Sequence, residues 1–220
     1  MKNYTDLNII LDRSGSMSSI APDITGGIQS FLKKEKESGD DTKVSLYQFD
    51  DIYETIFIDK LITEDINIPL VPRGTTALLD AVGKTMASVG EKLDKLPEDE
   101  RPNRVLFLVI TDGAENSSRE FSFEDVKKNI KHQRETYAWD FVFLGTTEDA
   151  LFQGEGMGIG KGSTRGFTRS SADIMNMFSQ VSDSYTSYKS LNRADLSTRG
   201  TTFIIQDDAA DVDNSSLISK

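Results

Sequence analysis

Residues 7–16 have the sequence LNIILDRSGS, in which an apolar run ends at a carboxylate and a loop of serines and glycine begins. A short run of Leu and Ile bounded by such a loop is typical of a buried parallel strand. Similar apolar runs lie at residues 105–110 and 141–144. Helical patterns separate the three runs, and this alternation predicts a parallel sheet.

Four segments carry apolar residues at helical spacing. Two of them extend from Ile24 to a stop at Gly39 and from Leu78 to Leu96. The other two begin at capping boxes, one of Ser122 and Asp125 and one of Ser170 and Asp173. A serine followed three residues later by an acidic residue is a helix start signal. We therefore expect helices that pack on the sheet between its strands.

One further pair of strands is predicted at residues 44–49 and 52–58, with only Asp50 and Asp51 between them. A link this short allows only an antiparallel hairpin. The expected fold class is therefore α/β: a Rossmann-like, doubly wound, mostly parallel sheet with one antiparallel edge strand and helices on both faces.

The pattern of strands and helices fades from about Asn192. We expect residues 1–191 to form one domain and residues 192–220 to form a polar, acidic C-terminal tail that is partly disordered. Residues 201–205 are an alternative candidate for a short edge strand. The five alternating glycines of residues 154–162 fit neither the dinucleotide fingerprint nor a phosphate loop, so they predict a flexible loop.

The charge and composition narrow the functional classes. The chain has 36 acidic and 25 basic residues, a formal net charge of -11, no cysteine and one histidine. Such a surface repels nucleic acid and anionic lipid, and any metal must be held mainly by oxygen. No secretory signal or membrane-spanning run is evident, which favours a soluble cytoplasmic protein of bacterial or phage origin.

Oxygen ligands gather in three segments at the predicted ends of strands or the start of a helix. They are Asp12-Arg13-Ser14-Gly15-Ser16, Arg73-Gly74-Thr75-Thr76 and Thr111-Asp112-Gly113. Sites in open α/β sheets form outside the carboxyl ends of the strands, so these segments should converge. Hydroxyls and carboxylates suit Mg²⁺, with Mn²⁺ or Ca²⁺ as alternatives. Only two carboxylates leave the ion short of negative charge, so an open position should attract another carboxylate.

These three segments, in this order and spacing, resemble the metal-ion-dependent adhesion site (MIDAS) of von Willebrand factor A (vWA) domains. The resemblance covers roughly residues 4–190 and implies a Rossmann-like fold. It also implies a set of metal ligands, namely Asp12, Ser14, Ser16, Thr75 and Asp112. In this family a partner protein typically completes the coordination with an Asp or Glu side chain.

Two details of the second segment are open. Thr76 stands beside Thr75 and also offers a hydroxyl, although the family pattern favours Thr75. Arg73 stands where many relatives have a glycine. Arg13 and Arg73 could touch an incoming carboxylate, but exposed arginines are usually solvated, so we assign neither a specific role.

The expected function is a divalent-metal-dependent protein-binding module, not an enzyme. A Ser-His-Asp hydrolase is disfavoured because the single histidine, His132, lies on a charged helix face. A metal-dependent phosphohydrolase is the main alternative, but it needs a second Asp two residues after the first, where Ser14 stands. A scaffold subunit with a structural metal is the third possibility.

Overall fold

The computed structural model describes residues 2–39, 41–146, 150–191 and 203–205. Its centre is a six-stranded sheet with the order β3-β2-β1-β4-β5-β6. The strands are β1 (Lys2–Asp12), β2 (Thr42–Phe49), β3 (Tyr53–Leu61), β4 (Pro102–Ile110), β5 (Asp140–Thr146) and β6 (Thr164–Phe167). All neighbouring strands are parallel except β2 and β3, which are antiparallel at one edge. The predicted fold class is confirmed.

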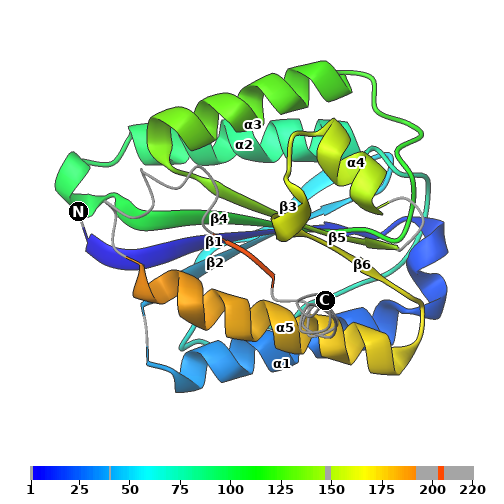
Figure 1. Ribbon diagram of the computed structural model, residues 1–220, viewed down its shortest axis with the longest axis horizontal. Coiled ribbons are helices and arrows are strands. Elements are labelled where there is room, and N and C mark those ends of the chain that lie inside the picture. The colour runs from blue at the N-terminus through cyan, green and yellow to red at the C-terminus, as the bar shows by residue number, and fades with distance from the viewer. Residues whose placement is uncertain (1, 40, 147–149, 192–202, 206–220) are drawn as a thin grey trace, which may run out of the picture.

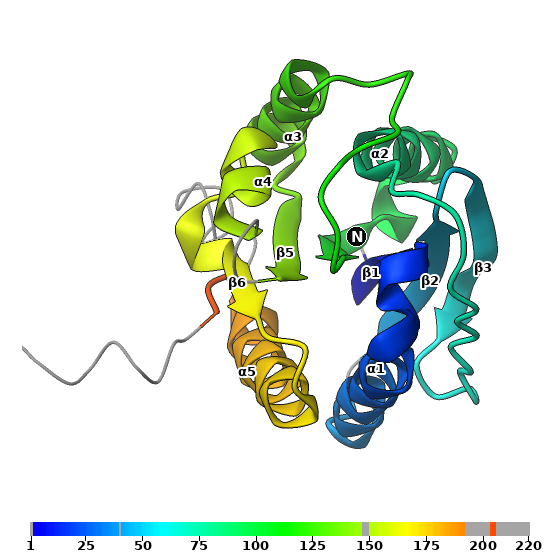
Figure 2. The same cartoon turned by 90° about the vertical axis from the view of Figure 1, so that its right-hand side faces the viewer.

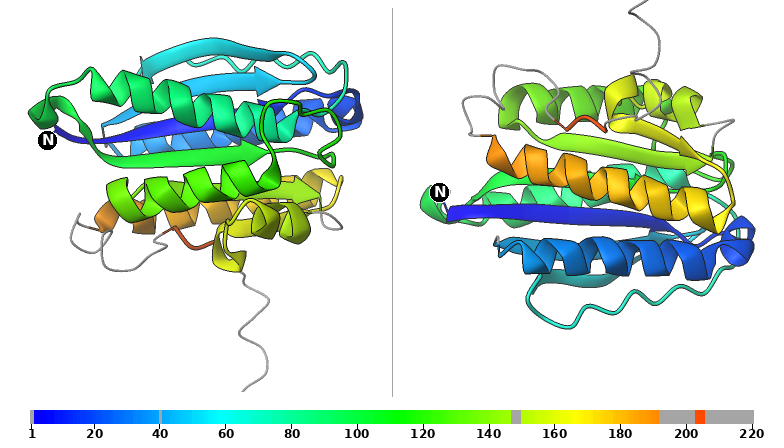
Figure 3. Two further views of the ribbon diagram at one scale, coloured as in Figure 1. Left: turned by 90° about the horizontal axis from the view of Figure 1, so that it is seen from above. Right: turned by 60° about the horizontal axis from the view of Figure 1, so that its bottom comes forward.

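Helices cover both faces of this sheet (Figure 1). The helices are α1 (Ala21–Glu37), α2 (Leu78–Asp94), α3 (Phe123–Tyr137), α4 (Ala150–Gly156) and α5 (Ser171–Ser190). One face is covered by α1 and α5, and the other by α2 and α3, as the views from above and below also show (Figure 3). Short 3-10 turns occur at Gly15–Ser19, Glu98–Glu100 and Lys161–Ser163.

Local signals predicted the starts of α3 and α5. Ser122 accepts a hydrogen bond from the Asp125 amide, and the Asp125 side chain accepts one from the Ser122 amide, which completes the predicted capping box of α3. Ser170 likewise caps α5 by accepting from the Asp173 amide. The stop signal after α1 is also confirmed, because Gly39 has φ 76°, a conformation that favours glycine.

The core has two layers, one on each side of the sheet. Alternate residues of β1 supply both layers: Leu7, Ile9 and Leu11 pack against α1 and α5, whereas Ile10 packs against α2. Alternation of this kind follows from the two-residue repeat of a strand. In the described ranges, no helix is long and apolar enough to cross a membrane.

Three features differ from the sequence predictions. Residues 154–162 do not form an open loop: they include the end of α4 and a turn whose Met157 and Ile159 side chains are fully buried. The sixth strand, β6, was not predicted because only four residues form it. Residues 203–205 are not a strand, but Phe203 and Ile205 are buried in the core. The rest of the predicted tail lies outside the described residues.

Candidate metal centre

The three predicted ligand segments meet at the carboxyl ends of β1 and β4, which are neighbours in the sheet. Figure 2 views the molecule from this end. The first segment follows β1 and leads into the turn Gly15–Ser19, and the third follows β4. The second segment precedes α2 and is joined to the first by a hydrogen bond from the Gly15 amide to the Gly74 carbonyl, 3.2 Å.

Asp12 is completely buried at the end of β1. One carboxylate oxygen accepts from the Ser14 amide and the other from the Thr111 hydroxyl, each at 2.6 Å. Burial raises the pKa of Asp12 to about 6, the hydrogen bonds partly offset that rise, and the nearby charge of Asp112 adds to it. The ionised Asp12 carboxylate is therefore not balanced by a nearby positive charge among the described residues.

The remaining oxygens of the first and third segments form a hydrogen-bonded chain. The hydroxyls of Ser14 and Ser16 lie 2.9 Å apart, and Ser16 donates to Asp112 Oδ1 at 2.6 Å. Asp112 is buried, and its other oxygen, Oδ2, accepts no hydrogen bond from the described residues, although Arg169 Nη2 lies 3.0 Å from it as an ion pair. Ser16 is exposed, so this side of the cluster faces solvent.

The structure brings together four of the five predicted ligands but places Thr75 elsewhere. The Thr75 side chain is exposed, and its hydroxyl donates to Ser117 at 3.0 Å. Thr76 is buried, and its hydroxyl lies within 3.1 Å of the point that a Cβ on Gly113 would occupy. Ser16 Oγ and Asp12 Oδ2 lie 3.4 and 3.9 Å from the same point. The geometry thus favours Thr76 over Thr75 as the threonine of the site.

Gly113 has no side chain, and this leaves a space open between the oxygens of Thr76, Ser16 and Asp12. Any larger residue would put a Cβ among the oxygens of Thr76, Ser16 and Asp12. The space is bordered by two hydroxyls and the Asp12 carboxylate. In the neighbouring Asp112, one buried carboxylate oxygen accepts no hydrogen bond from the described residues. Hard divalent cations prefer oxygen ligands of these kinds. The residues present therefore fit a divalent cation.

The donor set is poor in charge. Among the described residues, no group of three or more His, Cys, Asp or Glu side chains could hold a metal ion. The candidate centre has two carboxylates, Asp12 and Asp112, and otherwise hydroxyls. Such a centre would leave a divalent ion with coordination positions that another molecule could fill.

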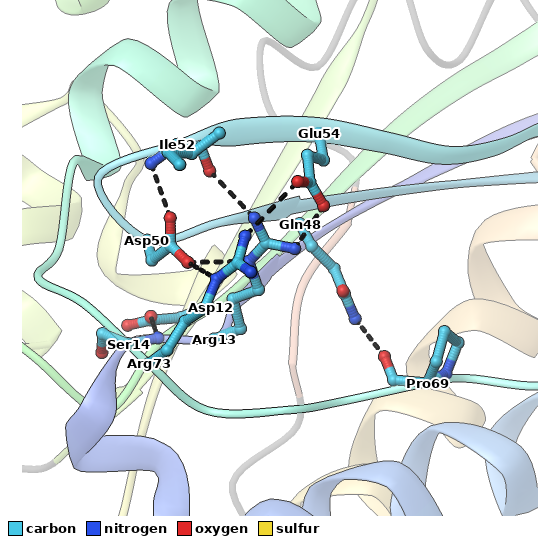
Figure 4. Close-up of polar contacts among 9 residues, drawn as sticks. All are labelled: Asp12, Arg13, Ser14, Gln48, Asp50, Ile52, Glu54, Pro69 and Arg73. Carbon is cyan, nitrogen blue, oxygen red and sulfur yellow. Dashed lines mark hydrogen bonds and ion pairs between the residues drawn. The ribbon is translucent and has the colours of Figure 1, made fainter.

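A second cluster, which we call the Asp50 clamp, lies beside the candidate centre and consists of Asp50, Arg13, Arg73 and Glu54 (Figure 4). Asp50 follows β2, is fully buried, and accepts from Arg13 Nε at 3.0 Å and from Arg73 Nε at 2.7 Å. Glu54 accepts from both arginines at the outer side. The expectation that Arg13 and Arg73 are merely solvated is therefore wrong.

The Asp50 clamp positions the ligand segments. The Arg73 amide donates to the Arg13 carbonyl at 2.7 Å, and the Ala77 amide donates to the Asp50 carbonyl at 2.9 Å. Gly74 has φ 66°, and a Cβ there would meet Asp51. Sequence reasoning assigned Asp50 only to a turn. Its position directly after a buried strand, as for Asp12, was the signal that could have identified it.

Comparison with solved structures supports the fold. No family model matches the sequence, and no curated protein matches it. Solved structures do match: the ArnB paralog VWA2 from Sulfolobus acidocaldarius has 15% identity and a TM-score of 0.52, with 82% of this chain and 45% of that chain covered. The PilB minor pilin from Streptococcus sanguinis, as a D319A mutant, has 12% identity and a TM-score of 0.56, with 84% and 62% covered.

Proximal thread matrix protein 1 from the mussel byssus is a third similar structure. The form with zinc in its MIDAS motif has 16% identity and a TM-score of 0.54, with 82% of this chain and 45% of that chain covered. The present chain thus spans less than two thirds of the length of these proteins. The order of strands, the antiparallel edge and the helices on both faces agree with these matches. The chain has the fold of von Willebrand factor A domains.

Proposed function

We propose that this chain is a divalent-metal-dependent protein-binding module and not an enzyme. The observation that carries the proposal is the cluster of Asp12, Ser14, Ser16, Thr76 and Asp112 around the open space at Gly113. These side chains would hold the ion. Mg²⁺ is the proposed ion, because the donors are all hard oxygens, with Mn²⁺ or Ca²⁺ as alternatives.

The proposed ligand is an Asp or Glu side chain of a partner protein. The centre has two carboxylates, and they balance the charge of a divalent ion only if both are ionised. The other contacts of the ion would come from neutral hydroxyls. An ion held in this way attracts a further anionic oxygen at its solvent side, near the exposed Ser16. A likeness in fold alone does not identify a function, so this proposal depends on the chemistry of the site.

The only histidine does not favour an enzymatic alternative. His132 is exposed on α3, and its Nδ1 lies 3.3 Å from the Thr136 hydroxyl of the same helix. Ser14 interacts with Ser16 and lies beside Asp12, so it has no histidine to activate it as a nucleophile. The described contacts thus give no serine and histidine pair of the hydrolase kind.

A pull-down from a cell extract tests the proposal. The bait is the intact chain, the Asp12→Ala variant, or the control Asp51→Ala, each with Mg²⁺ or with chelator. Circular dichroism and urea unfolding first establish that all baits are folded. We expect one protein to bind the intact chain and the Asp51→Ala control only with Mg²⁺, and not to bind Asp12→Ala.

Equal retention in every condition would show that the metal centre is not the recognition surface. A phosphatase assay would then examine the hydrolase alternative. Metal that is retained without any effect on partner binding would favour the scaffold with a structural ion.

A further inference from the structure

Arg169 is the one residue outside the predicted ligand set whose charge reaches the candidate metal centre among the described ion pairs. It lies in the connection between β6 and α5, far in sequence from the three ligand segments. Its Nη2 atom lies 3.0 Å from Asp112 Oδ2, the buried oxygen that has no hydrogen-bond donor. The contact joins an exposed guanidinium, 51% accessible, to a carboxylate that is completely buried.

The position of Arg169 is determined by the residues on either side of it. The amide and the hydroxyl of Thr168 both donate to Asp173 Oδ2, at 2.6 and 2.9 Å. Ser170 caps α5 by accepting from the Asp173 amide. Arg165 pairs with the other oxygen of Asp173 at 3.2 Å. The backbone on both sides of Arg169 is thus tied to the first turn of α5, and its side chain extends toward the candidate centre.

From these contacts we infer that Arg169 is an internal cation that competes with the divalent metal for Asp112. This inference depends on the proposed metal site. A guanidinium and a metal ion on the same carboxylate repel each other, so the metal binds only as Arg169 gives way. Without metal, the guanidinium offsets part of the negative charge of the buried Asp112 carboxylate.

The guanidinium is suited to this exchange because one of its sides faces water. A fully buried ion pair would be too costly to separate, whereas an arginine that is half exposed can move to solvent at a small cost. The contact between Arg169 and Asp112 is an ion pair without the geometry of a hydrogen bond, so no hydrogen bond is lost when it opens. Arg169 therefore lowers the affinity for metal without closing the site.

The test is Mn²⁺ binding, followed by electron paramagnetic resonance, to wild type, Arg169→Gln and the control Arg119→Gln. Arg119 is an exposed arginine that lines a different pocket with Thr75 and Ser117, so both variants lose one exposed positive charge. We expect Arg169→Gln to bind Mn²⁺ roughly fivefold more tightly than wild type, about 1 kcal/mol, and Arg119→Gln to differ by less than twofold.

An equal gain in both variants would overturn the inference, because it would show only a general field effect. Unchanged or weaker binding by Arg169→Gln would also overturn it. If wild type and both variants bind no Mn²⁺, the proposed function itself fails and this inference fails with it. If all three bind equally, the metal site stands and only the role of Arg169 is rejected.

A second measurement follows the guanidinium directly. In nuclear magnetic resonance spectra, the Nε–H signal that is missing from Arg169→Gln belongs to Arg169. Titration with diamagnetic Mg²⁺ should shift this signal in wild type and leave that of Arg119 in place. A signal of Arg169 that stays unchanged while Mg²⁺ binds would contradict the exchange.

Discussion

Asp12 and Asp50 stand at the carboxyl ends of two adjacent parallel strands, and both are completely buried, yet their surroundings are opposite. Burial alone would raise the pKa of Asp50, but hydrogen bonds from Arg73 and the Ile52 amide and the charge of Arg13 lower it below its usual value. Burial raises the pKa of Asp12 to about 6, and Asp112 adds negative charge. Two arginines thus neutralise Asp50, whereas the described contacts of Asp12 are all with neutral donors.

This difference in charge distinguishes the Asp50 clamp from the candidate metal centre. The Asp50 clamp uses one arginine from each of two ligand segments, Arg13 and Arg73. It therefore holds the loops that carry Asp12 and Gly74 against the end of β2. Among the described residues, the candidate metal centre has one cationic contact, and it comes from a half-exposed side chain. A cluster that is fully paired stabilises the fold, whereas a cluster that is short of positive charge is suited to bind a metal.

Removing the charge of Asp50 should have the largest effect. Among the described contacts, Asp50→Asn leaves the nearly buried Arg13 guanidinium with Glu54 as its one anionic partner, beside the carbonyl of Ile52. Since an unpaired buried charge is strongly destabilising, we expect the free energy of unfolding to fall by about 3 kcal/mol. Urea denaturation measures this change. Asp51→Asn, at the exposed neighbouring position, should alter stability by less than about 0.5 kcal/mol.

The two aspartates should also respond oppositely to pH. Asp12 has a raised pKa in the folded state, so the folded protein binds more protons than the unfolded chain between about pH 4 and 6. Its contribution to stability is therefore lost as pH rises through about 6, by roughly 3 kcal/mol in all. Asp50, with a lowered pKa, contributes stability above about pH 4 and loses it in more acidic solution.

Urea unfolding of wild type and Asp12→Asn in chelator, from pH 4 to 7.5, isolates the Asp12 contribution. The stability of wild type relative to the variant should decrease as pH rises. A difference that is constant across this range would mean that Asp12 has an ordinary pKa. Saturating Mg²⁺ should remove the decrease, because the ion stabilises the carboxylate form.

Sequence patterns predicted the sheet, its antiparallel edge and four helices, because apolar periodicity and capping signals are local. Four of the five predicted ligands converge for a related reason, since each ends a strand or lies in the loop after it. The Asp50 clamp was missed because its ion pairs join residues 19 to 41 positions apart. The contact of Arg169 with Asp112 was missed because it depends on how the β6–α5 connection folds.

Filling the space at Gly113 should weaken metal binding without disturbing the Asp50 clamp. In Gly113→Ala the new Cβ would lie 3.1 Å from Thr76 Oγ1 and 3.4 Å from Ser16 Oγ. We expect roughly tenfold weaker Mn²⁺ binding, about 1.4 kcal/mol. Gly160→Ala is the matched control, because nothing lies within 4 Å of a Cβ there. Equal affinities for the two variants would place the ion elsewhere.

Two single substitutions test whether the hydroxyl of Thr75 or that of Thr76 binds the metal. Valine has the shape of threonine without its hydroxyl, so each substitution removes one possible ligand and little else. We expect Thr76→Val to bind Mn²⁺ several-fold more weakly and Thr75→Val, whose hydroxyl only donates to Ser117, to change by less than twofold. If Thr75→Val loses affinity and Thr76→Val does not, the assignment from the sequence is the right one. The first segment would then bind its ion on the exposed side of the loop, away from Gly113.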